Sequence, residues 1–195
     1  DASDGIYVNY SLVTGQSPQT ACLAGTYNPN TGSTTSTDCL NADAGHYVLS
    51  TGQNSQTPCS IGTFQTSTGQ PSCDEADIGY YVDQSASTNQ TSCPPGTSTT
   101  SIGSVSINDC YTDTDFDGIP DIIDPDDDND GYLDDLDAFP LNPNEWDDTD
   151  NDGIGNNADT DDDGDGMSDS DEILAMTNPL LADSDNDGVG DYSDM

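Results

Sequence analysis

The first half of the chain carries its apolar residues in short groups that begin with a glycine and contain an aromatic residue. Three such groups open a repeat: Gly5-Ile6-Tyr7-Val8, Gly45-His46-Tyr47-Val48 and Gly79-Tyr80-Tyr81-Val82. A related group that starts with a cysteine follows each of them, at residues 22–27, 59–64 and 93–98. Because the stretches between the groups are rich in Gly, Ser and Thr, the pattern predicts short irregular strands joined by turns.

Six cysteines divide this half into three units, residues 1–42, 43–76 and 77–111. A unit of this length with so few apolar residues cannot bury a core of its own. One disulfide in each unit would compensate, contributing about 3 kcal/mol in the chain-entropy model. The regular spacing, without His or Cys-x-x-Cys partners, favours disulfides over zinc and an extracellular, secreted or cell-surface location.

Six cysteines allow 15 pairings, and the sequence alone does not choose among them. We favour Cys22 with Cys39, Cys59 with Cys73 and Cys93 with Cys110, because each unit then remains self-contained. The alternative pairs Cys39 with Cys59 and Cys73 with Cys93 across two equal separations, and it would join neighbouring units.

The Cys-x-x-Gly-Thr-Tyr/Phe core resembles the cysteine-rich repeats of extracellular receptors, of the tumour-necrosis-factor-receptor-like and ephrin-receptor-like kind. The resemblance covers residues 1–111, and each unit here has two cysteines where those families usually have more. It implies an elongated series of stacked modules.

In the second half, the residues that repeat at regular spacing are aspartates and not apolar residues. Five copies of Asp-x-Asp-x-Asp-Gly begin at Asp113, Asp126, Asp148, Asp161 and Asp183, with spacings of 13, 22, 13 and 22 residues. A twelve-residue loop of this kind binds calcium through positions 1, 3, 5, 7 (by its carbonyl), 9 and 12, and it needs glycine at position 6 for a sharp turn. Loops one to five are therefore residues 113–124, 126–137, 148–159, 161–172 and 183–194. The glycines at position 6 are Gly118, Gly131, Gly153, Gly166 and Gly188.

Each loop supplies six predicted metal ligands, and together they indicate about five or more Ca²⁺ ions. Loops one and two supply Asp113, Asp115, Asp117, Ile119, Asp121, Asp124, Asp126, Asp128, Asp130, Tyr132, Asp134 and Asp137. Loops three to five supply Asp148, Asp150, Asp152, Ile154, Asn156, Asp159, Asp161, Asp163, Asp165, Met167, Asp169, Glu172, Asp183, Asp185, Asp187, Val189, Asp191 and Asp194. A disordered acidic tract has no reason to keep this register.

Only loop four is followed by a helical pattern, over residues 172–177, which Asn178-Pro179 ends. Glu172 at position 12 makes this loop a full match to the EF-hand calcium pattern. Residues 112–195 are therefore predicted to be a calcium-wrapped array with little regular secondary structure and one short helix.

The Asp-x-Asp-x-Asp-Gly phrase with alternating spacing resembles the thrombospondin type 3 calcium repeat, over residues 113–194. The resemblance implies a chain that wraps successive calcium ions, which serve as its core. The fold class expected for the whole chain is an elongated multi-module repeat protein with small, irregular, disulfide-stapled β units before the array.

The charge excludes several classes of function. The chain has 39 Asp and Glu, no Lys or Arg and a formal charge of -39, so no internal cation pairs with the acids. This charge repels nucleic acid and anionic membranes, and no apolar run approaches the roughly 20 residues that span a bilayer. We expect no enzyme: His46, the one histidine, fills the slot of Ile6 and Tyr80 in the sister units, and no nucleophile has a base.

The expected role is structural: a calcium-stiffened rod that forms a surface filament, stalk or matrix fibre by head-to-tail self-association. The alternative is a cell-adhesion or ligand-recognition module, with tyrosines such as Tyr47, Tyr80 and Tyr81 available and the calcium array as spacer. The apolar residues after Asp137 and Glu172 would pack locally or form an inter-subunit contact.

Two further expectations concern processing. Asn9-Tyr10-Ser11 and Asn89-Gln90-Thr91 are N-glycosylation acceptor sequences, so attached glycans are expected at Asn9 and Asn89. A start at Asp1 without an initiator Met indicates a processed protein or a segment of a longer one.

Overall fold

The computed structural model describes residues 5–8 and 19–193, so Asn9 and Asp194 lie outside the described residues. The chain divides into two compact units, residues 1–120 and residues 121–195. Within the described residues, none of the helices is long and apolar enough to cross a membrane.

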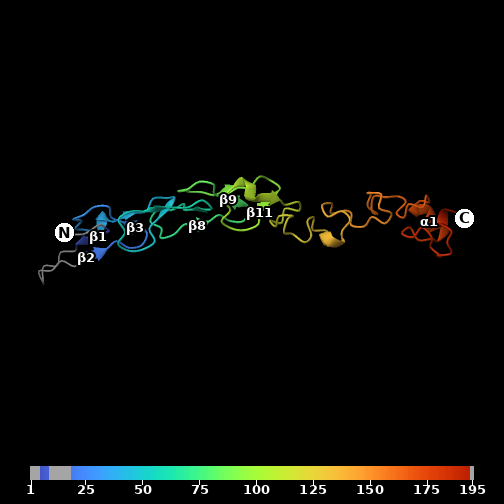
Figure 1. The fold of residues 1–195 in the computed structure, drawn as a ribbon, viewed down its shortest axis with the longest axis horizontal. Helices are drawn as coiled ribbons and strands as arrows, with labels where there is room; N and C mark the ends of the chain where they lie inside the picture. The colour runs from blue at the N-terminus through green and yellow to red at the C-terminus, as the bar shows by residue number, and fades with distance from the viewer. Residues whose placement is uncertain (1–4, 9–18, 194–195) are drawn as a thin grey trace. The chain divides into compact units, whose positions relative to one another are not determined.

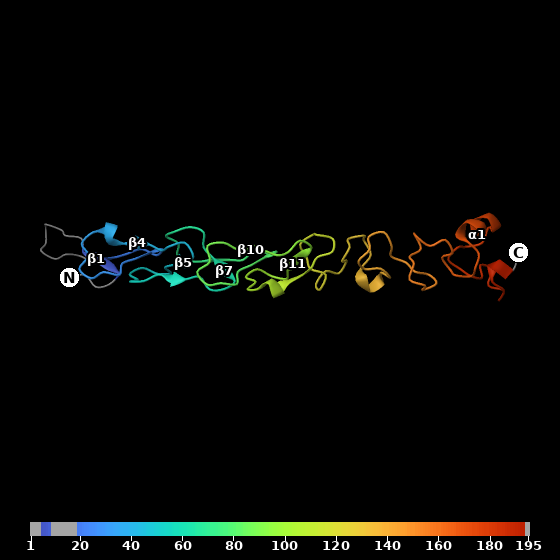
Figure 2. The same cartoon turned by 90° about the horizontal axis from the view of Figure 1, so that it is seen from above.

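The described residues of the first unit form six antiparallel two-stranded hairpins (Figures 1 and 2). The strands of the first three are β1 (Ile6–Val8) with β2 (Gln19–Ala21), β3 (Thr26–Tyr27) with β4 (Leu40–Asn41), and β5 (His46–Tyr47) with β6 (Thr57–Pro58). The strands of the last three are β7 (Thr63–Phe64) with β8 (Asp74–Glu75), β9 (Tyr80–Tyr81) with β10 (Thr91–Ser92), and β11 (Thr97–Thr99) with β12 (Cys110–Thr112). Two hairpins each contain one short 3₁₀ helix between their strands: η1 (Ser36–Asp38) lies between β3 and β4, and η2 (Ile107–Asp109) lies between β11 and β12.

A glycine with positive φ precedes the first strand of each hairpin, and in the first four hairpins its N–H donates to a backbone carbonyl of the next hairpin. The N–H of Gly25 donates to the Val48 carbonyl at 2.8 Å, and the N–H of Gly45 donates to the Gln65 carbonyl at 2.8 Å. The acceptor lies three residues after the glycine of the following hairpin in each case. The described hairpins therefore form a stack held by backbone hydrogen bonds from one step to the next.

From the second hairpin to the sixth, the residue three positions after this glycine is buried, and it alternates in chemistry. Val48 and Val82 are apolar, whereas Asn28, Gln65 and Thr99 are polar, and all are at most 5% exposed. The polar side chains have partners: for example, the Gln65 side-chain N–H donates to the Ser72 carbonyl at 3.1 Å. This narrow line of buried residues takes the place of a large hydrophobic core.

Alternate hairpins are closed by a disulfide or by a side-chain pair. The disulfides are Cys22–Cys39, Cys59–Cys73 and Cys93–Cys110, which is the pairing within units and not between neighbours. In hairpins β5–β6 and β9–β10, a glutamine makes two hydrogen bonds to an aspartate 13 residues earlier; the pairs are Asp43–Gln56 and Asp77–Gln90.

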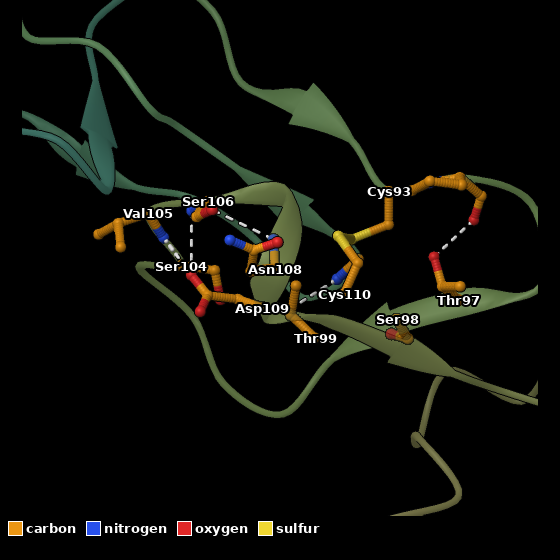
Figure 3. The surroundings of a disulfide bond; sticks show 12 residues. Cys93, Thr97, Ser98, Thr99, Ser104, Val105, Ser106, Asn108, Asp109 and Cys110 are labelled. Carbon is orange, nitrogen blue, oxygen red and sulfur yellow. Dashed lines mark hydrogen bonds between the residues drawn. A yellow bond between two sulfur atoms is a disulfide. The ribbon is translucent and has the colours of Figure 1, made fainter.

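The turn before the last cysteine is fixed by its own side chains (Figure 3). The Asp109 carboxylate accepts hydrogen bonds from the N–H groups of Val105 and Ser106 at 2.9 and 3.0 Å, and Ser106 Oγ accepts one from Asn108 N–H. This capping arrangement closes η2 directly in front of Cys110, so the cysteine reaches Cys93 without help from a core.

The second unit has little regular structure: η3 (Asp134–Leu136), α1 (Asp169–Ala175) and η4 (Asp191–Ser193). The helix predicted at residues 172–177 is present as α1, but it lies two to three residues nearer the N-terminus. It begins three residues earlier because the Ser168 side chain accepts a hydrogen bond from the Asp171 N–H as its N-cap, and it ends because Met176 adopts φ 69°. Small hairpins stapled by three disulfides, one short helix and little else confirm the predicted fold class.

Candidate metal centres

Each of the five loops gathers the carboxylates of its positions 1, 3 and 5. In every triplet, one oxygen from each residue lies within 4.8 Å of the others. Oxygens on opposite sides of a Ca²⁺ ion, each about 2.4 Å from it, are about 4.8 Å apart, so the three fit a single coordination sphere. The triplets are Asp113, Asp115 and Asp117; Asp126, Asp128 and Asp130; Asp148, Asp150 and Asp152; Asp161, Asp163 and Asp165; and Asp183, Asp185 and Asp187.

Backbone N–H groups hold these carboxylates in place with the same pattern in loop after loop. In loop two, Asp128 accepts from the N–H of Asp130 at 3.1 Å, and Asp130 accepts from the N–H of Tyr132 at 2.8 Å. The carboxylate of Asp126 accepts from the N–H of Gly131 at 3.2 Å. The corresponding bonds in loop four use Asp163, Asp165 and Asp161.

This pattern explains the residues at positions 4 and 6. The chain turns back towards the position 1 carboxylate there, with φ between about 58° and 101° at both positions. Position 6 is glycine in every loop, and position 4 is Asn129, Asn151, Gly164 or Asn186 in loops two to five, the residue types that adopt this conformation most easily. Phe116 is the exception in loop one, with φ 66°.

One oxygen of several carboxylates is used by the backbone, and the other is buried without a hydrogen-bond partner. At position 1 this oxygen is Oδ1 of Asp113, Asp126, Asp148 and Asp161. At position 3 it is Oδ2 of Asp128 and Asp163, and at position 5 it is Oδ2 of Asp130. A buried carboxylate oxygen without a partner costs free energy, so a cation is the group that these triplets fit.

The side chains at positions 9 and 12, which are predicted metal ligands, also accept hydrogen bonds from backbone N–H groups. The position 9 side chain accepts from the N–H of position 2 in loops two to five; its residues are Asp134, Asn156, Asp169 and Asp191. At position 12, Asp137 accepts from the Phe139 N–H at 2.6 Å and Asp159 accepts from the Asp161 N–H at 3.0 Å. These residues close the ends of their loops.

Loop one is built into the first unit through its triplet. The N–H of Asp113 donates to the Gly96 carbonyl at 3.1 Å, and Ser98 Oγ donates to the Gly118 carbonyl at 2.9 Å. Asp113 is 6% exposed as a result. Positions 9 and 12 of loop one, Asp121 and Asp124, fall in the second unit and are not part of this triplet.

Burial without a cation disturbs the acid–base equilibria of the loops. Burial raises the pKa of Asp113, Asp128 and Asp163, and the carboxylates beside them add to the effect. The largest change is at Glu172, which has no exposed surface and no hydrogen-bond partner on either oxygen. Burial, with the charges around it, raises the pKa of Glu172 to about 7.

The sequence patterns missed two buried acids. Asp162 at position 2 of loop four is 9% exposed, with one oxygen lacking a partner, and burial raises its pKa. Glu145, before loop three, is 7% exposed and accepts from the Asn157 N–H at 2.9 Å. The run of three aspartates at residues 161–163 was the only signal for the first, and nothing in the sequence marked the second.

Comparison with known proteins finds neither a family model that matches the chain nor a curated protein with significant similarity to it. The function is therefore argued from the disulfides and the aspartate triplets. The chain is a cysteine-rich repeat module followed by repeated aspartate triplets that could bind metal.

Proposed function

We propose that the chain is an extracellular calcium-binding structural protein, in which Ca²⁺ occupies the five aspartate loops. The observation that carries this proposal is the calcium-sized spacing of the five triplets, together with the buried carboxylate oxygens without partners in the triplets of loops one to four. Calcium suits the donors because it is a hard cation that takes six to eight oxygen ligands in flexible geometry. The likeness of the loops to thrombospondin type 3 repeats supports the same choice of metal.

The calcium ions have a structural task in this proposal. The second half holds 30 of the 39 acids, and no lysine or arginine is available to offset them. Without metal, repulsion between carboxylates favours expansion of this part of the chain as the pH rises and they ionise, and with metal the ions act as its core. Five dications offset 10 of the 30 charges, so shared carboxylates and further cations balance the rest.

We propose further that the units associate head to tail into a surface filament, stalk or matrix fibre, with no catalytic role. Stacked hairpins that bond to one another through the backbone support a load-bearing role, and so do disulfides, which are typical of proteins outside the reducing cytosol. The resemblance of the Cys-x-x-Gly-Thr-Tyr/Phe pattern to cysteine-rich receptor repeats also supports this proposal. Asn89 is exposed and suits an attached glycan.

Negative-stain electron microscopy tests the assembly, with the purified protein in calcium and after chelation at matched ionic strength. We expect long uniform filaments that collapse when calcium is removed. Isolated short particles in calcium would reject self-assembly and leave calcium binding untouched.

A second candidate is an adhesion or recognition module, with the calcium loops as spacer. Exposed apolar side chains on the hairpins favour it, among them Leu23 at 72% and Leu49 at 71% exposure. Tyr47, Tyr80 and Tyr81 favour it less, because of these three tyrosines only Tyr80 is exposed and the other two are half-buried. Binding of a partner protein or glycan by particles that remain single would support this candidate.

A further inference from the structure

Loop four differs from the other loops at position 12, where it has Glu172 in α1 in place of aspartate. Glu172 is 0% exposed, and neither of its oxygens has a hydrogen-bond partner. A glutamate at this position can bind calcium through both oxygens. Loop four therefore has, besides its triplet, a fully buried carboxylate without hydrogen-bond partners, on which the charges of Asp163 and Asp165 act.

The last turn of loop five lies against this centre. The N–H of Tyr192 donates to Oδ2 of Asp165 at 3.0 Å, across 27 residues of sequence, while Oδ1 of Asp165 accepts from the Met167 N–H. The Tyr192 side chain also shares a hollow of about 410 Å³ with Met167 of loop four and Leu174 of α1. A main-chain group of loop five thus fixes a carboxylate of the loop four triplet.

Asp191 brings a charge of loop five to the same place. It is 7% exposed, and its two oxygens accept from the N–H and Oγ of Ser184 at 3.1 and 2.6 Å. Its own N–H donates to the Ala182 carbonyl, so its position is fixed from both sides. The charge of Asp191 acts on both Asp163 and Glu172 of loop four.

We propose that loops four and five form one coupled metal centre, in which the last turn of loop five completes the site of loop four and the two ions bind together. The inference rests on the proposed calcium binding. Loop five positions Asp165 and adds the charge of Asp191, which strengthens the attraction for the ion in loop four. That ion in turn removes the repulsion that would drive loop five away from loop four.

Coupling between two sites is reciprocal, so each loop must affect the other by the same factor. Coupling energies of this kind correspond to roughly a 5- to 150-fold change in affinity. Loss of the loop four ion should therefore weaken loop five, and loss of the loop five ion should weaken loop four equally. Asp191 and Tyr192 are positioning residues for loop four in this arrangement.

The position 6 glycines provide a separate signal for each loop. Their N–H groups donate to the position 1 carboxylates in loops two to five, so their NMR amide signals report on each loop individually. The experiment is a calcium titration of the full-length, chelator-stripped protein labelled with ¹⁵N. The signals followed are Gly131, Gly153, Gly166 and Gly188.

Glu172→Gln should abolish the response of Gly166 and shift the midpoint for Gly188 at least about five-fold to higher calcium. Asp137→Asn is the matched control, because Asp137 holds position 12 of loop two before an insertion of the same length. This variant should affect Gly131 and leave the midpoints of Gly166 and Gly188 unchanged.

Asp185→Asn tests the coupling from the other side without altering a residue of loop four. It should move the Gly166 midpoint by at least about five-fold. Ser184→Ala, which removes the Oγ hydrogen bond to Asp191 but no predicted ligand, should shift Gly166 in the same direction. These two variants keep the test valid even where Glu172→Gln disturbs α1.

The outcomes separate the coupling from the calcium binding on which it rests. If the glycine signals of the wild-type protein respond to calcium but Asp185→Asn and Ser184→Ala leave Gly166 unchanged, the loops are independent and the coupling is rejected. If no glycine signal of the wild-type protein responds, calcium binding itself is rejected.

Discussion

Calcium should reverse the dependence of the second unit's stability on pH. In the metal-free protein, the pKa of Glu172 rises from its ordinary 4.5 to about 7. The folded state then binds more protons than the unfolded state between these values, so its stability is highest below about pH 4.5 and falls as the pH rises to about 7. A pKa difference of about 2.5 corresponds to about 3 kcal/mol lost across this window.

The raised pKa values of Asp128, Asp162 and Asp163 act in the same direction. With calcium bound, the sign changes, because the ions bind only ionised carboxylates and stability then increases with pH. Acid should thus partly replace calcium in keeping the metal-free chain compact.

Urea unfolding followed by the fluorescence of Trp146, the one tryptophan of the chain, measures this effect. Trp146 stacks on Tyr132 with ring centroids 5.0 Å apart, so its emission reports on the second unit. Unfolding is measured between pH 4.5 and 8, in metal-free buffer and in calcium at constant ionic strength. In metal-free buffer, Glu172→Gln should remove the loss of about 3 kcal/mol in the free energy of unfolding between pH 4.5 and 7. Metal-free stability that rises with pH, or a slope that Glu172→Gln leaves intact, would refute the reasoning.

Three more predictions concern the stack and the choice of metal. Gly25→Ala should cost about 1–3 kcal/mol more than Gly32→Ala in urea unfolding of the first unit, because both glycines have positive φ but only at Gly25 would a methyl group meet backbone, at Gly69. Equal costs would argue against close packing between hairpins. Replacing Cys59 and Cys73 together by serine should cost about 3 kcal/mol in the same assay, and an unchanged midpoint would count against the disulfide's role. Magnesium should fail to fold the second unit at concentrations where calcium succeeds, as circular dichroism and Trp fluorescence can measure, because it demands compact octahedral geometry and gives up its water reluctantly.

The sequence was sufficient for features that depend on local spacing. A carboxylate at positions 1, 3 and 5 before a glycine bonds to the backbone of its own loop, so each triplet assembles without distant contacts. The cysteine pairing that we favoured also joins residues close in the chain, 14 and 17 residues apart, although the spacing alone did not exclude the alternative. Such features are encoded within a few residues, which makes their pattern readable.

The division of the first unit into stacked hairpins was harder to predict, because it depends on contacts between one hairpin and the next. The groups at Gly45 and Gly62 looked like different parts of one unit, yet both begin a hairpin that donates to the next. Their shared Gly-x-aromatic pattern was the available signal. The pairing of Asp43 with Gln56 and the approach of Tyr192 to Asp165 had no local signature, because they bring together residues that are distant in the chain.

The number of calcium ions bound per chain tests the central claim most directly. The chelator-stripped protein would be equilibrated by dialysis against buffered calcium at physiological ionic strength, and bound metal would be counted by elemental analysis. Five or more ions per chain, reduced by one or more in an Asp148→Asn variant, is the expected result. Fewer than one ion per chain, or an equal count in wild-type and variant proteins, would contradict the assignment of the aspartate loops as calcium sites.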